Sequence, residues 1–178
     1  MVDKNKKNKA FSIAETLIVM MITGILLSLS LPVIKHLSNH DKYLYRSAVN
    51  MFENIIEELS NDTLLYPNGI NEGFKNTYSS TYFCNNFVDR VNILKSSVNC
   101  SNTDPSTQAP AFITTNGMRW WGFANTFENA TTENTVYVDV NGSKNPNTLQ
   151  KDILRINVNR MGRITIPASG QEEVYMQN

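Results

Sequence analysis

The apolar residues of this chain of 178 residues follow three successive patterns. A run without a single charge extends from Leu17 to Val33. Between Asp41 and Leu59, apolar residues then recur at every third or fourth position, as they do along one stripe of a helix. From Ala111 onward they alternate with other residues, as on one face of a β-sheet. The sequence therefore predicts an α+β protein in which a long helix precedes an antiparallel sheet.

The first two patterns are expected to form one helix over residues 11–61, about 75 Å long at about 1.5 Å per residue. Counted from Phe11, its first half is long enough to be transmembrane, which takes about 20 apolar residues. Gly24 and Pro32 are predicted to weaken, kink or break this helix, since proline removes an amide donor. The second half is amphipathic and should pack on the sheet through the stripe Leu44, Ala48, Phe52, Ile55, Ile56 and Leu59.

Short alternating segments predict an antiparallel sheet of four or five strands within residues 111–178. The turn pair Asn116-Gly117 lies inside the first hairpin. The tail, residues 167–178, is expected to be a loosely attached edge or disordered. The hairpin is predicted over 111–124, and the further strands at 135–140, 153–158 and 163–166.

Trp120 and Trp121 are neighbours in the predicted hairpin, so their side chains point to opposite faces of the sheet. We expect one of them in the core and the other exposed. Packing is the simpler role for both side chains, and glycan binding by an exposed tryptophan is the alternative.

Residues 62–110 are irregular and rich in turn formers. A short helix is predicted at 85–94, with Cys84 and Cys100 on either side of it. In an exported domain, two cysteines without a C-x-x-C spacing favour a structural disulfide over a redox site.

The start of the chain is basic, whereas the rest is mildly acidic and has no basic stripe of the kind that binds nucleic acid. Glu15 lies within the apolar stretch, where a charge costs about 2 to 3 kcal/mol on bilayer insertion scales. A basic leader before an apolar span stays in the cytoplasm, so the rest would be exported. The leader, residues 1–10, carries Lys4, Lys6, Lys7 and Lys9.

Three interpretations of this start are open. It could be a secretory signal cut near residues 28–30, where small residues lie two apart. It could be a plain membrane anchor, which explains the orientation but not Glu15. Alternatively, a cut between Ala10 and Phe11 leaves a free amine one helical turn from Glu15. Between packed subunits, Glu15 of one chain could then pair with that amine of its neighbour, and the pair would select a register.

Residues 9–17, Lys-Ala-Phe-Ser-Ile-Ala-Glu-Thr-Leu, resemble the class III leader of type IV pilins and of type II secretion pseudopilins. That family has a short basic leader, a small residue, then Phe, and Glu at the fifth mature position. The resemblance implies cleavage after Ala10, N-methylation of Phe11 by a prepilin peptidase, and an assembly contact at Glu15. Gly24 and Pro32 match the helix breakers of pilins, which implies a segment that loses helicity on assembly.

The loop of residues 139–152 groups oxygen donors around a glycine turn. Asp139, Asn141 and Asp152 could together bind calcium, a cation that prefers oxygen ligands. The stretch also resembles a loop of pilin-like proteins, and some pseudopilins bind calcium in this region. Lys144 lies among the donors and the EF-hand pattern is absent. A turn held by Asx hydrogen bonds, with no cofactor, is the alternative.

The chain shows no nucleophile–base arrangement and no phosphate loop. Its two histidines, His36 and His40, lie near the apolar run, so the predicted sheet region contains none. We therefore expect a structural subunit of an inner-membrane filament, a type IV pilus or a secretion pseudopilus, and no enzyme. Its expected partners are other pilin-like subunits, a prepilin peptidase and the inner-membrane assembly platform. A membrane-anchored binding domain that never polymerises and an ordinary exported enzyme are the alternatives.

Overall fold

The computed structural model describes residues 13–67, 74, 80–94, 98–124, 127 and 133–177, without the side chains of 29–39. The chain divides into two compact units, residues 1–39 and residues 40–178. The second is called the head unit below. It combines helices with a five-stranded antiparallel sheet, which confirms the predicted α+β class.

Helix α1 (Ile13–Asn61) is a single α-helix, as predicted. The residue after the helix, Asp62, accepts hydrogen bonds through its side chain. Its Oδ1 accepts the backbone N–H groups of Leu64 at 3.1 Å and of Leu65 at 3.2 Å. These Asx bonds replace the helical ones and stop the helix. The helix is continuous through Gly24 and Pro32, so a loss of helicity at these residues on assembly stays a prediction.

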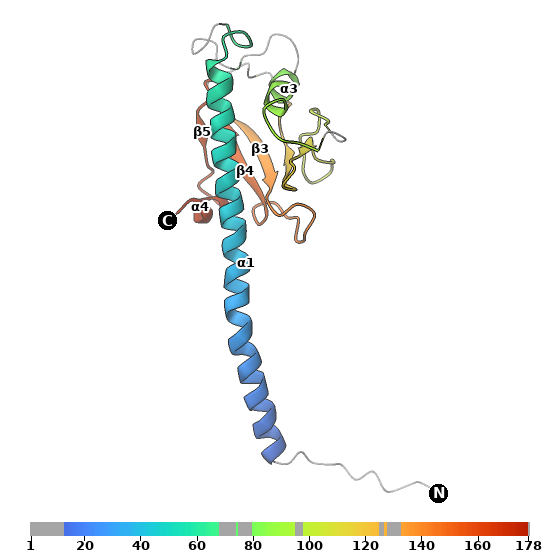
Figure 1. Ribbon diagram of the computed structural model, residues 1–178, viewed down its shortest axis with the longest axis vertical. Helices are drawn as coiled ribbons and strands as arrows, with labels where there is room; N and C mark the ends of the chain where they lie inside the picture. Colours follow the sequence, from blue (N-terminus) through green and yellow to red (C-terminus); the bar gives the residue numbers. More distant parts are fainter. Residues whose placement is uncertain are drawn as a thin grey trace, which may run out of the picture. The chain divides into compact units, whose positions relative to one another are not determined.

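The sheet has the order β1-β2-β3-β4-β5, and each strand pairs antiparallel with its neighbour in sequence (Figure 1). Its central strands pair in full register, with Val136 opposite Ile156 and Val138 opposite Leu154. The predicted hairpin and the three further strands are thereby confirmed. The strands are β1 (Phe112–Ile113), β2 (Arg119–Trp121), β3 (Asn134–Asp139), β4 (Ile153–Val158) and β5 (Ile164–Thr165).

Within the head unit, α1 runs along one face of the sheet, across β3 and β4 (Figure 1). The predicted stripe faces the core: Leu44 is partly buried and the other five residues are buried. Phe52 is fully buried, with its ring centroid 5.3 Å from that of Phe87 and 6.3 Å from that of Trp120. An aromatic cluster therefore joins α1 to the sheet.

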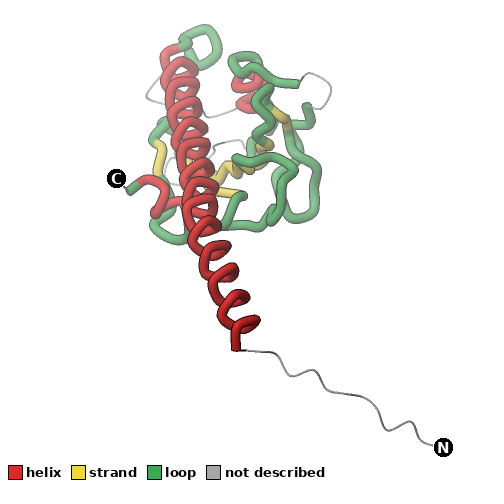
Figure 2. Tube along the Cα trace, turned by 60° about the horizontal axis from the view of Figure 1, so that its bottom comes forward, coloured by secondary structure: helices red, strands yellow, loops and turns green. Residues whose placement is uncertain are grey.

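Helix α3 (Tyr82–Val88) begins and ends earlier than the predicted 85–94. The residues after it pair with β1: Leu94 N donates to Ile113 O at 2.8 Å, and Thr115 N donates to Asn92 O at 2.9 Å. A helix through 92–94 would withdraw these groups from the sheet edge. Figure 2 shows that loops and turns make up much of the head unit around α3.

The prediction of a loose or disordered tail is wrong. Residues Gln171–Met176 form a helix, α4, whose Glu172 is fully buried. Arg155 binds that carboxylate through Nε at 2.8 Å and through its backbone N–H at 3.1 Å. From α1, Arg46 Nε donates to Tyr175 O at 2.7 Å, a stabilising position for a cation at a helix C-terminus.

The expectation of one exposed tryptophan is also wrong, because Trp120 and Trp121 are both buried. Trp121 lies on the face away from the main core but is covered there. Its Nε1 donates to Gln108 O at 3.0 Å, and the guanidinium of Arg119 lies 5.7 Å from its ring centroid. Glycan stacking on an exposed tryptophan therefore has no support in the head unit.

Candidate assembly site on the N-terminal helix

The predicted cleavage and methylation sites, Ala10 and Phe11, lie outside the described residues. Glu15 lies in the first turn of α1. The N–H groups at a helix N-terminus carry partial positive charge, which favours a carboxylate there. The helix therefore presents Glu15 at the end where a free amine on Phe11 would lie.

The first part of α1, residues 13–28, is mostly apolar and exposed on every side. The least exposed of its large apolar side chains, Ile22, has an exposed fraction of 51%. A stripe facing a core would leave some positions buried, and these residues leave none. An exposed apolar surface of this extent is typical of a site of contact with lipid or with other protein. The exposed residues are Ile13, Leu17, Ile18, Val19, Met20, Met21, Ile22, Ile25, Leu26 and Leu27.

Polar side chains in this stretch bond to their own helix. Thr16 Oγ1 donates to Ile13 O at 2.9 Å, Thr23 Oγ1 to Val19 O at 2.8 Å, and Ser28 Oγ to Ile25 O at 2.8 Å. Back-bonded hydroxyls cost little in an apolar environment, since the donor is already satisfied. Glu15 is then the group of this stretch whose burial costs most.

Among the described residues, no helix combines the length and the apolar character that crossing a membrane requires.

Among the described residues, a Cβ added at Gly24 would meet no atom within 4 Å beyond its chain neighbours and the backbone of its own helix, so no packing contact there requires glycine. A glycine inside a helix costs about 1 kcal/mol relative to alanine. Its position in an open stretch fits a role in helix flexibility or in close packing against another helix. Both are consistent with the predicted helix break at Gly24 and Pro32 but do not test it.

The loop of residues 139–152 brings the three predicted calcium ligands together. Asp152 is buried, and its carboxylate accepts the backbone N–H groups of Asn147 and Thr148, each at 2.7 Å. The side-chain amide of Asn141 lies 3.5 Å from Asp152 Oδ2. The loop is therefore held by side-chain hydrogen bonds of Asp152, as the alternative without a cofactor expects, but these bonds reach back to residues 147 and 148 and do not form an Asx turn.

Asp139 is fully buried and pairs with Arg119, whose Nε donates to Oδ2 at 2.9 Å. Burial raises the pKa of the Asp139 carboxyl above its usual range, although the guanidinium of Arg119 opposes the shift. Among the described residues, no group of three His, Cys, Asp or Glu side chains could hold a metal ion. The hydrogen bonds of this loop form without a cation. Calcium binding by Asp139, Asn141 and Asp152 therefore stays a prediction.

Cys84 and Cys100 form the predicted disulfide, with 5.7 Å between their Cα atoms. Cys84 lies within α3 rather than before it, so the bond ties the helix itself to the segment that leads into β1. Both sulfurs are buried in the head unit.

Replacing both cysteines by serine should lower the free energy of unfolding by about 3 kcal/mol, because the bond closes a loop of 16 residues. Urea unfolding of the full chain in detergent micelles, followed by tryptophan fluorescence, measures this loss. A reducing agent should cause a similar loss in the wild-type chain and none in the double-serine variant. Equal unfolding midpoints for the wild-type chain and the double-serine variant, both without reducing agent, would contradict the stabilising role.

No family model, curated protein or solved structure matches this chain.

Proposed function

We propose that the chain is a pilin-like structural subunit that polymerises from the bacterial inner membrane into a type IV pilus or a type II secretion pseudopilus. One observation carries the proposal: Glu15 lies in the first turn of α1, and the described large apolar side chains of this helix from Ile13 to Leu27 are all exposed. A monomer leaves this surface uncovered. Lipid before assembly and neighbouring α1 helices after it would cover the same residues.

In the proposed filament, the carboxylate of Glu15 forms an ion pair with the amine of Phe11 on a neighbouring subunit. A carboxylate within packed apolar helices is costly unless it is paired. A subunit out of register would leave both charges unpaired, so the pair stabilises one packing and penalises the others. The carboxylate of Glu15 would thereby fix how neighbouring subunits align along the filament.

The proposed partners are a prepilin peptidase and an assembly platform, and the proposed location is the bacterial inner membrane. A prepilin peptidase would remove residues 1–10 and methylate Phe11, and an inner-membrane platform would extract the subunit into the filament. Before extraction the chain would cross the membrane once, with residues 40–178 on the outer side. No catalytic role is assigned to the head unit.

The mature N-terminus tests the maturation step. When the chain is produced with a prepilin peptidase, intact-mass and peptide mass spectrometry should find N-methylated Phe11 as the first residue. The inactive-peptidase strain is the control and should yield the uncut leader. A terminus at Leu31 instead would indicate an ordinary secretory signal and would contradict the proposal.

A further inference from the structure

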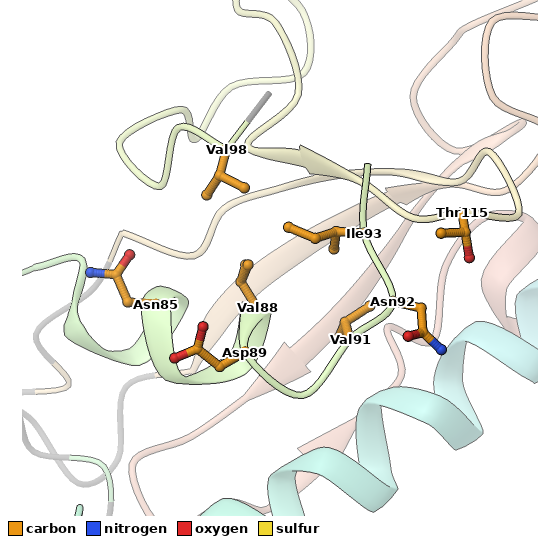
Figure 3. A pocket seen from close by; sticks show the side chains of 8 residues that line it. All are labelled: Asn85, Val88, Asp89, Val91, Asn92, Ile93, Val98 and Thr115. Carbon is orange, nitrogen blue, oxygen red and sulfur yellow. The ribbon is translucent and has the colours of Figure 1, made fainter. Parts of the chain in front are cut away.

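A groove of about 670 Å³ opens in the head unit beside α3, away from α1. Figure 3 shows Val88, Ile93 and Val98, from three separate segments, pointing toward one another across it. Its volume is in the range of ligand pockets, about 300 to 1,000 Å³. The remaining lining residues are Asn85, Asp89, Val91, Asn92 and Thr115.

The walls of this groove are held in place before anything binds. Asn85 and Val88 lie in α3, and Asp89 is its C-cap with helical backbone angles, so the three residues, at spacings of three and four from Asn85, lie on one side of the helix. The disulfide Cys84–Cys100 joins that helix to the wall that carries Val98. The opposite wall, residues 92–94, is hydrogen-bonded to β1. A preformed groove avoids the entropic cost of ordering its walls on binding.

Asp89 gives the groove its charge. It is exposed, and no ion pair to it is found among the described residues. The neighbouring cation, Arg90, is engaged elsewhere, since its Nε donates to Glu58 at 3.0 Å and its Nη2 to Asp62 at 2.8 Å. The groove therefore offers a carboxylate next to an apolar floor.

The other polar groups of the lining suit a peptide. Side-chain amides such as those of Asn85 and Asn92 both donate and accept hydrogen bonds, as a peptide backbone does. The valine and isoleucine floor would take an aliphatic side chain, and the Asp89 carboxylate would take an ammonium or guanidinium group.

We propose that this groove binds a peptide segment of another protein in which a lysine or arginine stands next to an aliphatic residue. The aliphatic side chain lies on Val88, Ile93 and Val98, and the cation pairs with Asp89. Binding at the groove does not depend on polymerisation through α1, so the two proposals can fail separately.

The probe is the capped peptide acetyl-leucyl-lysyl-leucinamide, and the same peptide with glutamate at its centre is the control. The full chain is held in lipid nanodiscs with its valine and isoleucine methyl groups labelled with carbon-13. Titration with the lysine peptide should shift the methyl signals of Val88, Ile93 and Val98. The glutamate peptide should bind at least about fivefold more weakly, because it places like charges together.

Two variants separate the groove from general charge effects. Asp89→Asn keeps the shape and should weaken the lysine peptide about fivefold, whereas Glu53→Gln removes an exposed charge from α1 and should change nothing. Val98→Arg should abolish binding by placing a cation in the groove. Equal affinity for both peptides, or unchanged binding by Asp89→Asn, would overturn the proposal. Methyl shifts that appear on concentrating the chain without peptide and vanish in Asp89→Asn would also overturn it, since the occupant would then be a second copy.

Discussion

Glu15→Val should remove the subunit from sheared filaments almost completely while leaving it cleaved and inserted in the membrane. The substitution leaves the amine of Phe11 without its partner between packed helices. Removing one member of a buried ion pair costs about 3 to 5 kcal/mol, equivalent to a loss of about a hundredfold or more in subunit association. Quantitative immunoblots of the sheared and membrane fractions measure the ratio.

The matched control is Thr16→Val, which introduces the same side chain at the neighbouring position. Thr16 Oγ1 bonds to its own helix at Ile13 O, so its loss should leave recovery in filaments close to wild type. If Glu15→Val subunits were recovered in filaments as efficiently as Thr16→Val subunits, the assembly role of Glu15 would be excluded. Absence of the variant from the membrane fraction would instead indicate an insertion defect, which the same blots detect.

Phe52→Ala should destabilise the head unit by about 3 to 5 kcal/mol, the usual cost of removing a large buried aromatic side chain. Phe52 is fully buried and contacts Phe87 and Trp120, so its loss leaves a cavity between α1 and the sheet. The collapse of neighbouring rings into that space sets where in the range the loss falls. Urea unfolding of the full chain in micelles, followed by the fluorescence of Trp120 and Trp121, measures it.

Glu53→Ala is the control for this experiment, because it truncates the adjacent, exposed residue of the same helix. Its effect should be within about 0.5 kcal/mol, as for most surface substitutions. A loss below about 1 kcal/mol for Phe52→Ala would mean that α1 does not pack on the sheet through this ring.

The elements found from the sequence are those with a local signal. The stripe around Phe52 repeats with the helical period, and β3 alternates with period two, so neither required knowledge of its neighbours. The pair Asn116-Gly117 marked a hairpin for the same reason, with Gly117 at a φ of 90° that favours glycine. The cysteine pairing followed from having two cysteines in a segment that the sequence predicts to be exported.

The features missed from the sequence depend on residues far apart in the chain. Trp121 is covered because Gln108 and Arg119 reach it, and α4 is ordered because Arg155 binds Glu172. No local pattern encodes either contact. The groove is similar in this respect, since its walls come from three segments and Asp89 is an ordinary surface residue in the sequence.

Glu15 differs from these residues because its predicted partner lies on another copy of the chain. The sequence indicated it through the cost of a charge in an apolar run. A structure of one chain shows the surface that must be covered and the turn on which the charge lies. The contact itself belongs to the assembled state, and for this reason the Glu15→Val experiment is decisive.

The attachment of α4 has a consequence for how the head unit is made. Lys42 Nζ donates to Gln177 O at 2.7 Å, and Arg46 Nη2 donates to the same carbonyl at 2.7 Å, across 135 and 131 residues of chain. During synthesis, a polypeptide emerging from the ribosome exposes Lys42 first and Gln177 much later. Any chain interrupted before α4 lacks the acceptors for both cations and leaves Tyr45 uncovered by Tyr175. The head unit therefore reaches these contacts with α1 only after the chain has been made through α4.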